Sequence, residues 1–131
     1  MALIWAYVAA FVSFGAMDAV WLSLAVPRLY RPELGAMLAP APRVGAAAAF
    51  YVAYIAGMVW FAIRPGLAQG PGAAALNGAL LGALCYATYD LTNQATLARW
   101  SLRVTLADMA WGAIATAAAS AIACAVARRF A

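Results

Sequence analysis

The sequence predicts an all-α membrane protein, a single domain over residues 1–131 built as a four-transmembrane-helix bundle. Hydrophobic residues make up 69% of the chain and charged residues 9%, whereas soluble domains hold about half and about a quarter. The apolar residues gather into four segments, each close to or above the ~20 residues that a helix needs to cross a bilayer. The predicted helices cover residues 2–27, 44–63, 72–97 and 104–127.

The segments between these helices contain the residues that end or turn a helix. The stretch from Pro27 to Arg43 holds four of the six prolines, so we expect the first helix to stop there and a loop to follow. Proline and glycine recur in residues 64–72, which predicts a compact linker and a tight helical hairpin. Residues 92–103 contain neither, so the third helix can continue before the chain turns into the fourth.

The net charge of +4 comes from eight arginines, and the chain has no lysine or histidine. These arginines flank the apolar segments and form no continuous basic face, which indicates membrane topology and no nucleic-acid partner. Two connections together carry five arginines, and the opposite side carries three. The positive-inside tendency therefore predicts that the arginine-rich connections are cytoplasmic and that both termini lie outside. The five are Arg28, Arg31, Arg43, Arg99 and Arg103, and the three are Arg64, Arg128 and Arg129.

Residue types that are missing or isolated exclude several chemistries. Without histidine there is no histidine-ligated haem or zinc and no histidine general base, and without lysine there is no Schiff-base chromophore. Cys85 and Cys124 lack the short spacing of metal or redox motifs and are typical of buried apolar positions. Carboxylates on separate helices without a ligand-spacing motif are a weak metal signal. We expect neither a metal nor a cofactor.

Three of the four acidic residues, Asp18, Asp90 and Asp108, lie inside predicted membrane helices. A charged side chain there costs roughly 2.5 to 3.5 kcal/mol on insertion scales, so such residues usually face a bundle interior and hold a partner. The directions of the helices place all three carboxyls in the half of the membrane next to the arginine-rich connections. We expect them to share one cavity, and they are the candidate catalytic residues.

The third predicted helix has a face of small and polar residues repeating every four positions, which are Gly78, Gly82, Tyr86, Asp90 and Gln94. Small residues at this spacing let helices approach closely in lipid. We therefore expect this face to point into the bundle. Its polar part, residues 86–93, adds Thr88, Tyr89, Thr92 and Asn93, whose side chains can bond a carboxylate or a ligand.

An Asp-x-x-Trp pattern occurs twice, as Asp18 with Trp21 and as Asp108 with Trp111. Residues three apart share a helix face, so both tryptophans can line the cavity. Two alternatives stay open. The aspartates can be buried, hydrogen-bonded structural residues that fix helix register, with arginines such as Arg28, Arg31 or Arg103 as partners, and the tryptophans can belong to an interfacial belt. The predicted ligand-binding residues are Asp18, Trp21, Tyr86, Tyr89, Asp90, Asn93, Asp108 and Trp111.

The same residues resemble a known family. Phe14, Asp18, Trp21 and Tyr30, the run Tyr86-Ala-Thr-Tyr-Asp-Leu-Thr-Asn93, and Val104-Thr105-x-x-Asp108-x-x-Trp111-Gly112 are similar to the DUF2177 family of small bacterial membrane proteins. The resemblance covers nearly the full length. It implies a multi-pass protein of four helices in the bacterial inner membrane, and some members are encoded near fatty-acid-modifying enzymes of the cyclopropane-synthase type.

Three functions fit these observations. The first is a bilayer protein whose intramembrane pocket binds an amphipathic or lipid-like molecule, with lipid modification by one protonated and one ionised aspartate left open. The second is a proton-coupled exporter of small molecules, which would need to be a homodimer because four helices enclose little volume. The third is a structural subunit of a membrane complex. The sequence does not decide whether the protein is an enzyme.

Overall fold

The computed structural model describes all residues from Met1 to Ala131 and contains helices, turns and loops but no strand. The prediction of an all-α four-helix bundle is confirmed. The first helical run comprises α1 (Ala2–Ala25), the π-helical segment η1 (Val26–Tyr30), α2 (Arg31–Leu34) and the 3-10 turn η2 (Gly35–Met37). The second comprises α3 (Val44–Met58), the π-helical segment η3 (Val59–Ile63) and α4 (Arg64–Gln69), and the others are α5 (Pro71–Thr96) and α6 (Leu102–Arg128).

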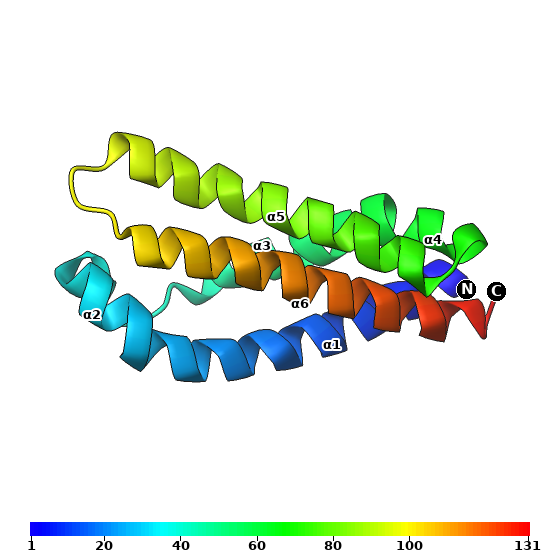
Figure 1. Cartoon of the computed structure of the whole chain (residues 1–131). Coiled ribbons are helices and arrows are strands. Elements are labelled where there is room, and N and C mark those ends of the chain that lie inside the picture. Colours follow the sequence, from blue (N-terminus) through cyan, green and yellow to red (C-terminus); the bar gives the residue numbers. More distant parts are fainter.

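Helix α6 is the central element of the bundle. It lies between α5 and α1, while α3 passes behind it and α4 lies beside the start of α5 in the view of Figure 1. Both termini lie at one end, where the rings of Trp5 and Phe130 stack at 4.4 Å, and α2 and the α5–α6 loop lie at the other (Figure 1). The structure thus separates the five arginines of the two connections from the other three, as the sequence predicts.

The first helical run extends beyond its predicted end, and this is a correction. The prolines at positions 27 and 32 do not stop it, because helical structure continues to Met37. The backbone widens into η1, where the N–H of Arg31 bonds the carbonyl of Val26, directly before Pro32. A proline ring clashes with the carbonyl four residues earlier in a regular α-helix, and a π-turn changes that spacing. The prolines therefore change the pitch of the helix.

The second connection shows the same device and is also shorter than predicted. Segment η3 closes with an N–H bond from Arg64 to Val59 and is followed by Pro65, so the helix continues to Gln69. The turn into α5 is made at Gly70, whose φ of +111° suits glycine alone. The predicted tight hairpin is present, but residues 64–69 are helical and a single residue makes the turn.

Three helical runs are long and apolar enough to cross a membrane: Ala2–Met37, Val44–Gln69 and Leu102–Arg128. The 26-residue helix α5 is long enough but less apolar, so the predicted third span differs from the others. Tyr86, Asp90 and Gln94 face α6, whereas the threonines of α5 are exposed and bond carbonyls of their own helix, which corrects their expected role at the site. The opposite side of the helix is exposed. That exposed side carries Leu76, Leu80, Leu84 and Leu91.

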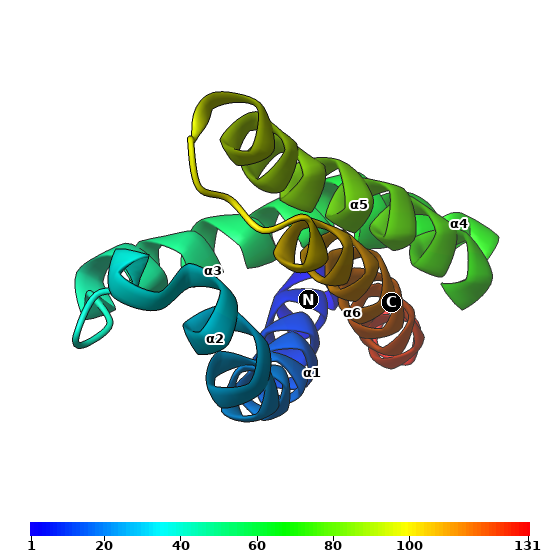
Figure 2. The ribbon, with the colours of Figure 1, turned by 60° about the vertical axis from the view of Figure 1, so that its left-hand side comes forward.

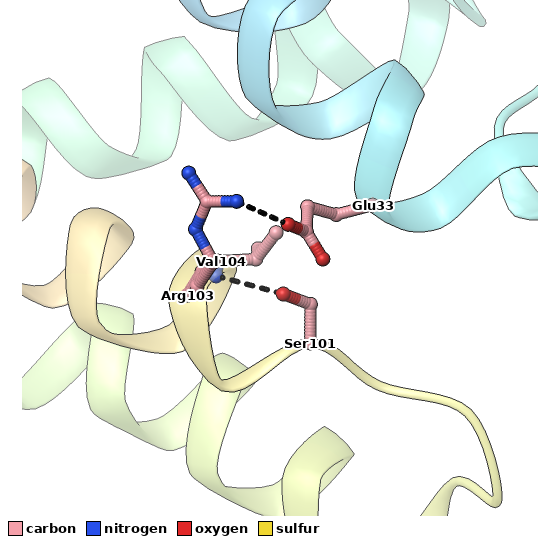
Figure 3. Close-up of polar contacts among 4 residues, drawn as sticks. All are labelled: Glu33, Ser101, Arg103 and Val104. Carbon is pink, nitrogen blue, oxygen red and sulfur yellow. Dashed lines mark hydrogen bonds and ion pairs between the residues drawn. The ribbon is translucent and has the colours of Figure 1, made fainter.

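The turn that connects α5 and α6 is fixed by local polar contacts (Figure 3). Ser101 caps α6 by accepting a hydrogen bond from the N–H of Val104 at 3.3 Å. Two residues after Ser101, Arg103 forms an ion pair with Glu33 of α2 at 2.9 Å. This pair joins the first connection to the start of α6.

Helix α3 packs along only part of its length. Every residue from 44 to 50 is exposed, whereas Tyr54, Ile55 and Met58 are buried. Figure 2 shows the first half of α3 diverging from α5 and α6, so that the bundle is open on this side. The apolar core lies towards the end with the termini, where Ile63, Ala74 and the alanines of α6 are fully buried.

Candidate functional site

The site is built on the contact between α5 and α6. A Cβ added at Gly82 would lie 2.0 Å from the carbonyl oxygen of Gly112, and one added at Gly78 would lie 2.6 Å from the Ser120 hydroxyl oxygen. The two backbones therefore touch where glycine allows it. This confirms that the predicted small-residue face of residues 78–94 points into the bundle.

At the polar end of the same face, successive residues of α5 each contact a residue of α6. The Tyr86 ring lies on Gly112, and the Gln94 amide oxygen accepts a hydrogen bond from the Thr105 hydroxyl at 2.9 Å. Between these contacts, Asp90 meets Asp108. The antiparallel packing of α5 and α6 thus brings together two aspartates that are 18 residues apart in the sequence.

Asp90 and Asp108 form a carboxyl pair. Their side chains are within hydrogen-bonding reach of each other, and such a bond forms only when one carboxyl carries a proton. Asp90 is 0% exposed and neither of its oxygens has another partner, while Asp108 also accepts a hydrogen bond from the Tyr30 hydroxyl. Burying an unpaired carboxylate is costly, so the two groups depend on each other.

Asp18 has a different environment from this pair. One of its oxygens accepts a hydrogen bond from the Tyr51 hydroxyl, and the other accepts one from the Trp111 indole at 3.1 Å. Asp18 is 7% exposed, and both oxygens are therefore satisfied by neutral donors. This carboxyl ties α3 and α6 to α1.

The two Asp-x-x-Trp units interlock. The rings of Trp21 and Trp111 stack with centroids 4.8 Å apart and an interplanar angle of 6°. Trp111 bonds Asp18, while the Trp21 indole donates to the Tyr30 hydroxyl at 3.0 Å, which in turn donates to Asp108. One continuous network of hydrogen bonds and ring stacking therefore joins the aspartates, and both tryptophans belong to it.

No aspartate of the network pairs with an arginine. The only ion pair in the chain is Arg103 with Glu33, outside the network. The arginine partners considered for structural aspartates are therefore absent, and the aspartates are hydrogen-bonded to other side chains instead. The partners are tyrosine and tryptophan side chains, which bring hydrogen-bond donors without a positive charge.

Several network residues were not predicted as site residues. Tyr51 and Tyr54 of α3 lie three apart, and the Tyr54 hydroxyl bonds that of Thr116 at 2.7 Å. On α6, the buried polar residues Thr105, Thr116 and Ser120 share the face of the predicted Asp108 and of Gly112. Their spacing of three or four is the signal that identified the face of α5, and applied to α6 it would have found them.

Two cavities meet at Asp108. One of 360 Å³ is lined by Phe50, Cys85, Tyr86, Tyr89 and Asp108. The other, of 220 Å³, shares Tyr89 and Asp108 and extends past Tyr30 and Trp100 towards the arginine-rich end. We call these two cavities the lateral groove. It lies beside the exposed half of α3, so the Asp108 carboxyl stands in the wall of an otherwise mainly apolar space.

The remaining predicted residues lie around this groove. Tyr89 is 59% exposed, packs edge-on against Trp100 at 5.7 Å and lines both cavities. Asn93 is half-buried one turn along the same helix and lines neither cavity. Cys85 lines the larger cavity and is exposed, which corrects the expectation that both cysteines are buried, whereas Cys124 is buried in the core.

Comparison with known proteins identifies a family. A family model described as a predicted membrane protein (DUF2177) matches residues 3–125. Neither the curated proteins nor the solved structures contain a significant match to the chain. The matched region includes every residue of the aspartate network and both walls of the lateral groove. The chain therefore belongs to the DUF2177 family of predicted membrane proteins.

Proposed function

We propose that this membrane protein binds one amphipathic, lipid-like molecule in the lateral groove, with the polar group of the ligand at Asp108. The observation that carries the proposal is the position of this carboxyl, in a wall shared by two cavities whose other lining is mainly aromatic and aliphatic. Ligand sites typically combine such apolar walls with a few polar groups that fix orientation.

The open side of the bundle supports entry from the bilayer. A further cavity of 290 Å³ adjoins the groove through Phe50 and Cys85 and continues between α3 and α5 past Gly57 and Leu81. Its lining is almost entirely apolar, as an acyl chain requires. A ligand whose head contacts Asp108 would thus have its tail beside α3, on the side that faces lipid.

The position of the core favours binding over export by a single chain. The groove adjoins the arginine-rich end, while the other end is filled by Ile63, Ala74, Ala123 and Ala127, all fully buried. A transport path would have to cross this packed region. Lipid modification is a second use of the same groove, in which Asp108 would contact the substrate and Asp90 would hold the exchanged proton.

The proposal is tested by mass spectrometry of the molecules that the gently purified protein retains. We expect a bound amphiphile in the wild type and a roughly tenfold loss of it in Asp108→Asn, because a hydrogen bond to a charged group contributes about 1.5 to 3 kcal/mol. Glu33→Gln is the matched control, since it neutralises an acid outside the groove. Equal amphiphile in wild type and Asp108→Asn, with both folded, would contradict the proposal.

A further inference from the structure

The larger cavity of the groove has the composition of an organic-cation site. Three aromatic rings, those of Phe50, Tyr86 and Tyr89, and the Asp108 carboxyl line its 360 Å³. Aromatic faces attract a quaternary or alkylated ammonium group, and a carboxylate supplies the opposite charge. No arginine lines this cavity or the smaller one that adjoins it. An anionic headgroup would find no positive charge there.

Asp90 can hold a proton but is not positioned to contact a ligand. It is fully buried, lines none of the cavities, and faces Asp108 with no other partner for either oxygen. Like charges in contact within a dry interior repel each other, which favours one proton between the two carboxyls where no counter-charge is near.

We infer that the cavity takes the positively charged headgroup of an amphipathic organic cation, and that this cation replaces the proton shared by Asp90 and Asp108. The inference rests on the proposed function and names the class of its ligand. Asp108 is the exchanging group because it alone touches both the other carboxyl and the cavity.

The exchange conserves charge. Without ligand, the pair holds one proton and carries a charge of −1. When the cation binds, the proton leaves to water, both carboxyls are ionised, and the cation returns the net charge of pair and ligand to −1. The titratable groups that face the pair are Tyr30 of η1, Asp18 of α1, and Tyr86 and Tyr89 of α5. None of them can carry a positive charge.

The test uses the full chain in dodecyl maltoside, with decyltrimethylammonium as the cation and 1-decanol as an uncharged amphiphile of equal chain length. Calorimetric titration in buffers of different ionisation enthalpy gives both affinity and protons released. We expect the cation to bind at least about tenfold more tightly than decanol. We also expect release of about one proton, and an affinity that falls about tenfold per unit decrease in pH while the pair is protonated.

Substitution of Asp90 tests whether the released proton comes from the Asp90–Asp108 pair. Asp90→Asn supplies an amide donor to Asp108, so it should bind the cation without releasing a proton, whereas Glu33→Gln should behave as the wild type. Proton release in Asp90→Asn equal to that of the wild type overturns the inference. If Asp90→Asn does not fold, the wild type decides alone, because an affinity independent of pH also overturns it.

The two proposals fail in different ways. If decanol and the cation bind equally well, the groove binds amphiphiles but the cation class is wrong. If neither binds and the purified protein retains no amphiphile, the proposed function fails together with the inference.

Discussion

The contact between α5 and α6 and the first half of α3 are opposite extremes within one small protein. Along α5 and α6, glycines bring the backbones into contact, and buried polar side chains meet in fixed pairs. Along residues 44–50 of α3, every residue is exposed and no neighbouring helix covers the surface. The first region has the features of a rigid scaffold, and the second those of a surface open to lipid.

The difference shows how one sequence can hold buried carboxyls and still admit a ligand. The close α5–α6 contact fixes Asp90 and Asp108, and the divergence of α3 leaves Asp108 accessible from one side. Helices α5 and α6 thus position the carboxyls, whereas α3 determines whether a ligand can reach Asp108. Substitutions in the first region should therefore affect folding, and substitutions in the second should affect binding.

The largest effect is expected from Gly82→Leu. Even the first added carbon would lie 2.0 Å from the Gly112 carbonyl oxygen, and overpacking of this kind costs about 3 kcal/mol or more. We expect loss of folded protein or a large fall in the midpoint of thermal unfolding. Ala48→Leu is the matched control on exposed α3 and should be neutral. Similar midpoints for the two variants would remove the distinction between the regions.

Asp→Asn variants test the carboxyl pair. Asp90→Asn and Asp108→Asn should be strongly non-additive in ligand affinity, with a coupling energy of roughly 0.5 to 3 kcal/mol, because residues in contact share their interactions. Asp18→Asn should combine with either more nearly additively, since Asp18 has its own donors, Tyr51 and Trp111. Binding titrations of single and double variants measure this. If the changes in binding free energy of Asp90→Asn and Asp108→Asn simply add in the double variant, the two carboxyls act separately.

Phe50→Ala tests whether the open region serves binding more than stability. Phe50 is 44% exposed and lines the larger cavity, so its loss should change the unfolding midpoint little and weaken amphiphile retention several-fold. Val52→Ala on the same helix, 57% exposed and lining neither cavity of the groove, should change neither property. A stability loss in Phe50→Ala as large as in Gly82→Leu would mean that α3 belongs to the scaffold.

The orientation of the groove can be determined without altering the fold. In a Cys85→Ala background, a cysteine at Gln69 should react with an impermeant thiol reagent from outside and one at Ala36 should not, given five arginines near Ala36 and three at the other end. Both positions are exposed, so stability should not change. The reverse labelling would place the arginine-rich end of the groove outside the cell.

Much of the site follows from spacing along single helices. The four-residue repeat through Gly82, Tyr86 and Asp90 predicts the inward face of α5, and the Asp-x-x-Trp units predict the tryptophans beside the carboxyls. Tyr30 and Tyr51 could not be assigned to the network in this way. Their contacts depend on the π-turn after α1 and on how α3 crosses α1.

The sequence by itself determined the all-α class, the apolar helices and the inward face of α5, because these depend on composition and on a period of 3.6 residues within one segment. Only the tertiary structure decided which carboxyls meet. Packing α5 antiparallel to α6 pairs Asp90 with Asp108 and leaves Asp18 to Tyr51 and Trp111. Helix ends were decided there too, since π-turns at Val26–Tyr30 and Val59–Ile63 carry two helices past prolines.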